Sequence, residues 1–191
     1  MHRRGEVPHF FEMIWLRFSW LILGVLPLSA HAEKTVVAVQ QVATQDLAAA
    51  LKSYEGRWVG HFTIHSTSSG YSETFPVEQL YWWEDGVLHG VAVSQRDAGM
   101  SSARSKSVMK DGKYFSEVKA GETVENYWGV LHDGGLIWLS SNLKRTQDYQ
   151  MKESIVEVDG GRVLQTEGFD TYVTGDGLAH LVYRGELKFV E

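Results

Sequence analysis

The chain of 191 residues contains no cysteine and only three prolines. Without cysteine it can form no disulfide, no thiolate nucleophile and no metal site with sulfur ligands. Its stability must come from apolar burial, for which the 43% of residues that are hydrophobic provide the material. Positive charge is also scarce, because 18 Lys and Arg stand against 24 Asp and Glu. The net charge of −6 argues against nucleic acid or an anionic membrane surface as a partner.

Helical periodicity is scarce too, because beyond Tyr54 no helical pattern of apolar residues lasts longer than one turn. Hairpin signals take its place at Asp85-Gly86, Asp111-Gly112, Asp133-Gly134-Gly135, Asp159-Gly160-Gly161 and Asp176-Gly177. Asp-Gly between strand-like segments favours a tight turn, because Gly accepts positive φ without steric cost and Asp tolerates it. The series predicts one antiparallel meander.

Segments that alternate apolar and polar residues lie between these turns. We expect ten strands, at residues 58–65, 73–83, 87–95, 103–109, 113–119, 123–131, 136–143, 149–158, 162–172 and 178–190. An open sheet of this size would leave two long edges, and closure into a barrel removes them. A two-sheet sandwich is the rival, but only residues 98–102 and 144–147 are long enough for a crossover. The sequence predicts an all-β, up-and-down barrel of about ten strands.

The first 32 residues have the layout of a secretory signal peptide. Arg17 precedes an apolar core at residues 21–26, and Ala30-His31-Ala32 forms a small-x-small cleavage site. Translation starts at Met1 or at Met13, and the second start gives the more compact signal. We expect export to the periplasm or the extracellular space, with no membrane span after processing. An uncleaved N-terminal anchor is the alternative, but the apolar stretch is short for a span.

Residues 33–43 are expected to form a tether, and residues 44–191 to form the barrel domain. Thr44 can cap a short helix in which Leu47, Ala50, Leu51 and Tyr54 share one face. Glu55-Gly56 ends this helix immediately before the first strand.

Gly56-Arg57-Trp58, at the junction of helix and first strand, resembles the Gly-x-Trp signature of the lipocalins and the wider calycin group of barrels. In that group the Trp closes one end of the barrel, and an Arg from a late strand packs over its ring. The resemblance implies this role for Arg184. The number of strands is more similar to the fatty-acid-binding proteins and the haem-binding nitrobindins. Thr146-Gln147-Asp148-Tyr149 is similar to the group's Thr-Asp-Tyr signature but carries one extra residue.

We expect aromatic side chains to project into the barrel and line a cavity for a small hydrophobic or amphipathic molecule. The candidate ligand-binding residues are Trp58, Phe62, Phe75, Tyr81, Trp83, Trp128, Trp138, Tyr183 and Arg184. The first alternative is that the aromatics fill the barrel and that an outer face with Leu80, Trp82 and Tyr127 binds a protein partner.

Histidine provides a further alternative. His180, beside the last strand, could ligate haem iron, as a histidine inside the barrel does in the nitrobindins. No metal site is expected elsewhere: His61 and His65 share a strand face, but at about 3.3 Å per residue they lie roughly 13 Å apart.

An enzyme that uses the barrel as a reaction chamber is the last alternative. Glu153, Glu167 and Arg184 fall on neighbouring strands and could form a polar cluster, although a solvated outer face is the expectation for such residues. The chain has no Gly-x-Ser-x-Gly, Ser-x-x-Lys or His-Glu-x-x-His motif. The sequence therefore gives no positive argument for catalysis.

Overall fold

A computed structural model describes residues 47–141, 150–174 and 177–191. The expected signal peptide, tether and Thr44 cap lie outside these residues, as do the second expected crossover and the Thr-Asp-Tyr-like segment. A short helix over residues 47–52 precedes the first strand. No helix in the described part of the chain is long and apolar enough to cross a membrane.

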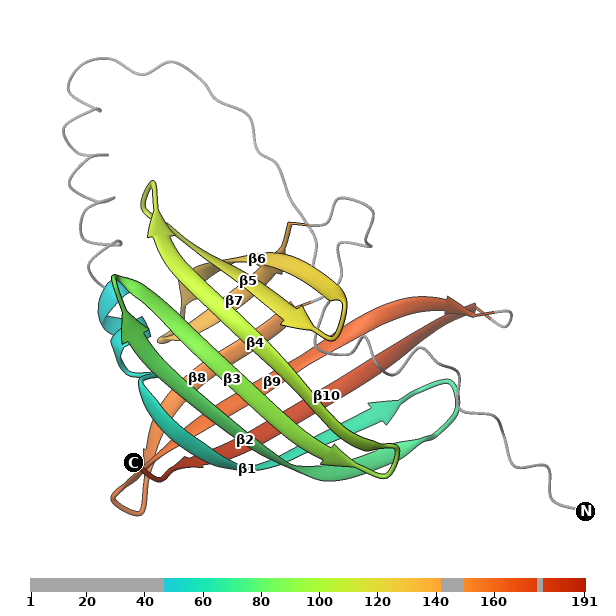
Figure 1. The fold of residues 1–191 in the computed structure, drawn as a ribbon. Coiled ribbons are helices and arrows are strands. Elements are labelled where there is room, and N and C mark those ends of the chain that lie inside the picture. The colour runs from blue at the N-terminus through green and yellow to red at the C-terminus, as the bar shows by residue number, and fades with distance from the viewer. Residues whose placement is uncertain (1–46, 142–149, 175–176) are drawn as a thin grey trace, which may run out of the picture.

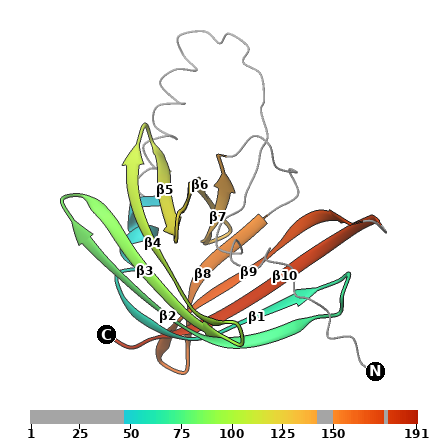
Figure 2. The same ribbon diagram turned by 45° about the vertical axis from the view of Figure 1, so that its right-hand side comes forward.

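Ten antiparallel strands close into a barrel, with the N-terminal strand paired to the C-terminal one (Figure 1). The strands are β1 (Gly56–Ser66), β2 (Ser72–Glu84), β3 (Val87–Arg96), β4 (Gly99–Lys110), β5 (Lys113–Ala120), β6 (Thr123–His132), β7 (Gly135–Ser140), β8 (Gln150–Val158), β9 (Gly161–Thr174) and β10 (Gly177–Phe189). Every strand pairs with its neighbours in sequence, and β1 with β10 completes the ring, as the turned view in Figure 2 also shows. The predicted all-β barrel with a preceding helix is confirmed.

The Asp-Gly turns explain why consecutive strands pair so closely. Asp85, Asp111, Asp133 and Asp159 have φ between 47° and 52°, and the glycines that follow have φ between 70° and 78°. Two successive positive φ values are typical of the type I′ turn, whose twist matches that of the flanking strands. Four of the five predicted turn signals therefore act as expected, and the fifth begins outside the described residues.

The Gly- and Ser-rich passage at residues 98–102 differs from the expectation. Strand β4 begins at Gly99, and Gly99 pairs directly with Arg96 of β3. The passage is therefore mostly strand and provides no crossover, because small residues extend a ladder without difficulty when a neighbouring strand supplies hydrogen bonds.

Side chains alternate strictly between the interior and the outer surface. Residues that face one another across the strands share a side, and Phe62 pairs with Phe75 of β2 and with Gly185 of β10 inside the barrel. A Cβ built on Gly185 would lie 2.2 Å from the Phe62 ring, so the glycine makes room for that ring. Interior positions thus combine rings with very small residues.

Trp58 is fully buried opposite Phe189, near the C-terminal end of β10. Its indole Nε1 donates to the carbonyl oxygen of Tyr54 at 2.7 Å. Arg162, at the start of β9, packs over the rings of Phe189 and Trp58, with its guanidinium carbon 3.7 Å and 5.3 Å from the two centroids. Arg162 also donates to the carbonyl oxygen of Ser53 at 3.1 Å. These contacts fasten the end of the helix to the barrel.

Candidate ligand-binding cavity

Small side chains on three adjacent strands leave space inside the barrel. The inward positions of β3, β4 and β5 are occupied largely by glycine, alanine and serine, namely Gly90, Ala92, Ala103, Ser105, Ser107 and Ser116. Arg104 and Lys106, which alternate with them on β4, are exposed on the outer face. The rings of Tyr81 on β2, Tyr114 on β5 and Tyr127 on β6 border these short side chains, which leave a gap that the rings do not fill.

A cavity of about 100 Å³ lies at this gap. This volume exceeds the roughly 10–15 Å³ that one water molecule requires and approaches the ~150 Å³ of an apolar cavity that admits benzene. Its remaining walls are aliphatic, aromatic or polar: Leu51, Tyr54, Gln79, Tyr81, Leu88, Val91, Val118, Tyr127, Tyr114, Trp138, Met151 and Glu153. Rings and aliphatic side chains with a few convergent polar groups are typical of a small-molecule site.

Glu153 is the only Asp, Glu, Lys, Arg or His in this lining. It points inward from β8 and is only 8% exposed. Its Oε2 accepts a hydrogen bond from the indole Nε1 of Trp138 at 2.7 Å. Burial raises the pKa of Glu153, and the neighbouring Trp138, Tyr54 and Thr166 donors only partly oppose that rise.

Tyrosine hydroxyls give the cavity further polar groups. Burial raises the pKa of Tyr54, Tyr81 and Tyr114, and the nearby Glu153 adds to the rise for Tyr54 and Tyr81. All three phenols are therefore neutral at physiological pH. The hydroxyls of Tyr54 and Tyr114 have no partner of standard hydrogen-bond geometry among the described residues. Buried hydroxyls in that state are available to a ligand or to water.

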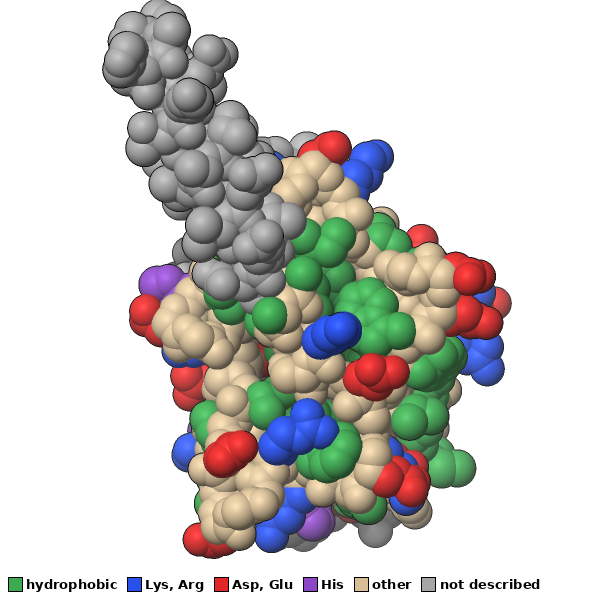
Figure 3. Space-filling view, turned by 90° about the vertical axis from the view of Figure 1, so that its left-hand side faces the viewer, with side chains coloured by type: hydrophobic (Ala, Val, Ile, Leu, Met, Phe, Trp, Pro, Cys, Tyr) green, Lys and Arg blue, Asp and Glu red, His purple; other side chains and the backbone are tan. Residues whose placement is uncertain are grey.

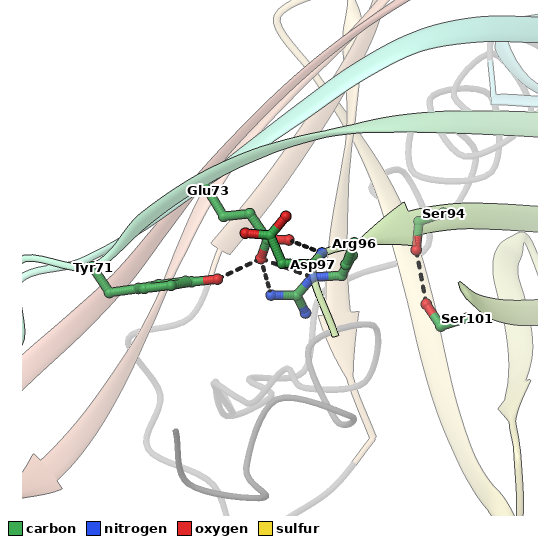
Figure 4. Close-up of polar contacts among 6 residues, drawn as sticks. All are labelled: Tyr71, Glu73, Ser94, Arg96, Asp97 and Ser101. Carbon is green, nitrogen blue, oxygen red and sulfur yellow. Dashed lines mark hydrogen bonds and ion pairs between the residues drawn. The ribbon is translucent and has the colours of Figure 1, made fainter. Parts of the chain in front are cut away.

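A second buried carboxylate lies toward the other end of the barrel (Figure 4). Glu73 accepts hydrogen bonds from the hydroxyl of Tyr71 at 2.6 Å, from Nε of Arg96 at 3.1 Å and from the backbone N–H of Asp97 at 2.9 Å. Burial opposes ionisation of Glu73, but these hydrogen bonds and the Arg96 charge outweigh it and lower its pKa. Arg96 also lies 5.0 Å from the centre of the Phe75 ring. Since the carboxylate is already fully paired, the cluster is a clasp between β2 and the end of β3.

The predicted ligand-binding residues occupy several different places. Tyr81 and Trp138 line the cavity. Trp58, Phe62, Phe75 and Tyr183 are buried in the core outside the cavity wall, and Trp83 packs against that core with its indole nitrogen buried. The interior is thus partly filled by the aromatics and partly hollow.

Trp128 requires a correction, because it lies on the outer face rather than inside. It pairs with Phe115 and Leu139, and the ammonium group of Lys113 lies 5.6 Å from its ring centre. Its neighbour Tyr127, expected on the outer face, is buried and lines the cavity. The predicted alternation of inward and outward side chains on β6 is therefore shifted by one residue from the alternation in the structure. The inward positions opposite Tyr127 are serines, which leave room for its ring.

Arg184 also requires a correction. Its side chain is 75% exposed on the outer face, with Glu186 at 4.0 Å, and Arg162 takes the position over Trp58. Glu167 pairs with Arg184 on the same outer face, whereas Glu153 points inward from the next strand. Glu167 and Arg184 thus lie on the outer face, as expected, whereas Glu153 does not, and the alternative of a polar cluster of all three is wrong.

His180 is likewise on the outer face of β10. Its Nδ1 lies 3.0 Å from the hydroxyl of Thr171, and its ring packs edge-on against Phe169. This orientation is wrong for a haem ligand inside the barrel. Among the described residues, no group of three or more His, Asp or Glu is arranged to hold a metal ion.

The outer face carries hydrophobic side chains that are dispersed. Leu80 and Trp82 are exposed as expected, and the Trp82 ring stacks on His89 with centroids 5.3 Å apart. On the face shown in Figure 3, hydrophobic side chains form several small patches separated by charged ones. Single exposed apolar residues of this kind are normal for a protein surface.

Comparison of the chain with protein-family profiles, with curated proteins and with solved structures gave no match. The candidate site therefore rests on its own geometry. Sequence reasoning missed most of the cavity wall, including Tyr54, Gln79, Tyr114 and the small residues. The available signal was the alternation of Ala103, Ser105 and Ser107 with Arg104 and Lys106, which marks an inner face of small side chains.

Proposed function

We propose that this chain is an exported binding protein that holds a small apolar or amphipathic molecule inside its barrel. The observation that carries the proposal is the cavity of about 100 Å³ beside the small inner side chains of β3–β5, which is also lined by four tyrosines. The buried hydroxyls of Tyr54 and Tyr114, which make no hydrogen bond of standard geometry among the described residues, add to it. The cavity is smaller than the ~150 Å³ that admits benzene but is partly open to solvent, so it suits a small molecule whose apolar end enters it while the rest extends outward.

Two further features support a calycin-like role. The helix, the Gly56-Arg57-Trp58 segment and the closed barrel occur in the order that the resemblance implies. An arginine packs over the closing tryptophan, although it is Arg162 rather than Arg184. Export is supported by the signal-peptide pattern of residues 1–32.

The test is native mass spectrometry with an absorbance scan on protein purified from the exported fraction without detergent. A reproducible excess mass that is released on denaturation is expected. Ala103→Leu, which fills the cavity without removing a hydrogen bond, should abolish the excess mass. Arg104→Leu, one residue along on the outer face, should retain it. A bare mass for the wild type, together with no thermal stabilisation by any small aromatic or aliphatic probe, would contradict the proposal.

A further inference from the structure

The two buried carboxylates of the barrel differ in what surrounds them. Glu73 is paired with Arg96 and accepts two more hydrogen bonds. Glu153 accepts one, from Trp138, and no Lys, Arg or His of the described chain forms an ion pair with it. Among the described residues, one buried acid therefore has a cation beside it and the other has none. Burying a carboxylate without a countercharge is costly.

The uncompensated acid is also the one that faces free space. Glu153 lines the central cavity, and Tyr54 and Glu153 together line a smaller cleft of about 70 Å³ between the helix and the β6–β7 turn. The other cavity-lining residues are neutral at physiological pH, since they are aliphatic, aromatic, hydroxyl or amide side chains. Within the described part of the chain, the only formal charge that the cavity lining can present to a ligand is thus negative.

We propose that the cavity selects ligands with a protonated amine on a small apolar body, and that Glu153 is the anchor for the amine. The inference rests on the proposed ligand-binding function and adds the chemical class of the ligand. The Glu153 carboxylate supplies the countercharge, and the aromatic rings of the wall supply apolar contact and favourable interaction with a cation. A carboxylate or phosphate ligand is disfavoured, because it would place a second negative charge beside Glu153.

The proton balance of this binding step can be measured. The titratable groups that face Glu153 are the phenols of Tyr54 and Tyr81, with Tyr114 across the cavity, and they remain neutral. A Glu153 carboxyl that is protonated in the free protein gives up its proton to solvent when an ammonium ion binds beside it. Amine binding should therefore release protons to the buffer, whereas binding of a neutral isostere should not.

The experiment compares benzylamine, benzyl alcohol and benzoate by calorimetry in buffers of different ionisation enthalpy. The proteins are the full chain, Glu153→Gln and the matched control Glu167→Gln on the outer face of β9. Glutamine retains an oxygen that can accept from Trp138, so the substitution removes the charge and preserves the shape. For the wild type and Glu167→Gln we expect benzylamine to bind about 10- to 100-fold more tightly than benzyl alcohol, with benzoate weakest. In Glu153→Gln the preference for the amine should disappear.

The outcomes separate the two proposals. Binding of benzyl alcohol as tightly as benzylamine, or an amine preference that survives in Glu153→Gln, would overturn the amine inference and leave the binding function intact. Failure of all three probes to bind, at concentrations that would detect millimolar affinity, would overturn both. An amine preference that is lost only in Glu153→Gln and is accompanied by proton release supports both.

Discussion

Arg162 offers the sharpest test of how the barrel is closed. The Arg162→Ala substitution removes a charged donor to the carbonyl oxygen of Ser53 and the packing of a guanidinium over Phe189 and Trp58. A hydrogen bond to a charged group contributes about 1.5–3 kcal/mol, and a cation–π contact about 0.5–2 kcal/mol. Because the side chain is half-buried, water can replace part of the hydrogen bonding and packing that the substitution removes. We therefore expect a loss of about 2–4 kcal/mol in the free energy of unfolding.

The assay is urea denaturation together with thermal unfolding followed by tryptophan fluorescence, since Trp58 lies at the site of the change. At about 2–4 °C per kcal/mol for a domain of this size, the melting temperature should fall by roughly 4–16 °C. Arg162→Lys keeps the charge but loses the planar fork that reaches ring and carbonyl together, so it should lie between wild type and Arg162→Ala.

Arg184→Ala is the matched control, because its side chain is exposed on the outer face and its ion pair with Glu186, at 4.0 Å, is a surface pair. A surface pair of this kind contributes about 0–1 kcal/mol. Equal unfolding free energies for Arg162→Ala and Arg184→Ala would refute the reasoning, because the contacts of Arg162 with Trp58, Phe189 and Ser53 would then add nothing to stability.

Two further predictions concern charge and packing inside the barrel. Glu73→Gln should cost up to about 3–5 kcal/mol at pH 7 because it leaves Arg96 buried without its partner. The cost should shrink as the pH falls below 4.5, because the hydrogen bonds and the Arg96 charge outweigh burial and lower the pKa of Glu73 from that ordinary value. Glu153→Gln should behave oppositely, with a gain in stability that appears above pH 4.5 and grows as the pH rises through the raised folded pKa of Glu153. Melting curves from about pH 2 to about pH 8 check both. A cost of Glu73→Gln that stays constant at low pH, or a gain for Glu153→Gln that does not grow with pH, would contradict them. Gly60→Ala should destabilise the protein by more than about 2 kcal/mol, since its Cβ would lie 2.0 Å from a backbone oxygen of β10. Gly129→Ala should cost less, because its Cβ would lie 3.2 Å from the Trp138 ring. Similar denaturation midpoints for the two variants would argue against a rigid contact between β1 and β10.

The strand order was predictable from sequence because turn chemistry is local. Asp followed by Gly specifies two successive positive φ values, and this determines a tight hairpin whatever the rest of the chain does. Closure followed from the number of hairpins and from the cost of open edges. These arguments need no knowledge of which residues face one another across the sheet.

The site could not be predicted in the same way, because it depends on pairing between strands. Tyr127 and Trp128 are adjacent aromatics, and either can be placed inward until the register with β5 and β7 is known. Arg162 reaches Trp58 only because β9 and β1 both flank β10. The cavity itself arises from small residues on three strands, and no single segment of sequence contains it.

The closed ring of strands also has a consequence for how the chain folds. Nine of the ten strand pairs join neighbours in sequence, and only β1 with β10 joins distant segments, with Trp58 opposite Phe189. Hairpins can form early and locally, so the largest loss of chain entropy is concentrated in one late event. Until β10 docks, β1 and β9 expose unpaired edges that can recruit other chains. The pairing of β1 with β10 therefore removes the two strand edges at which unclosed chains could associate.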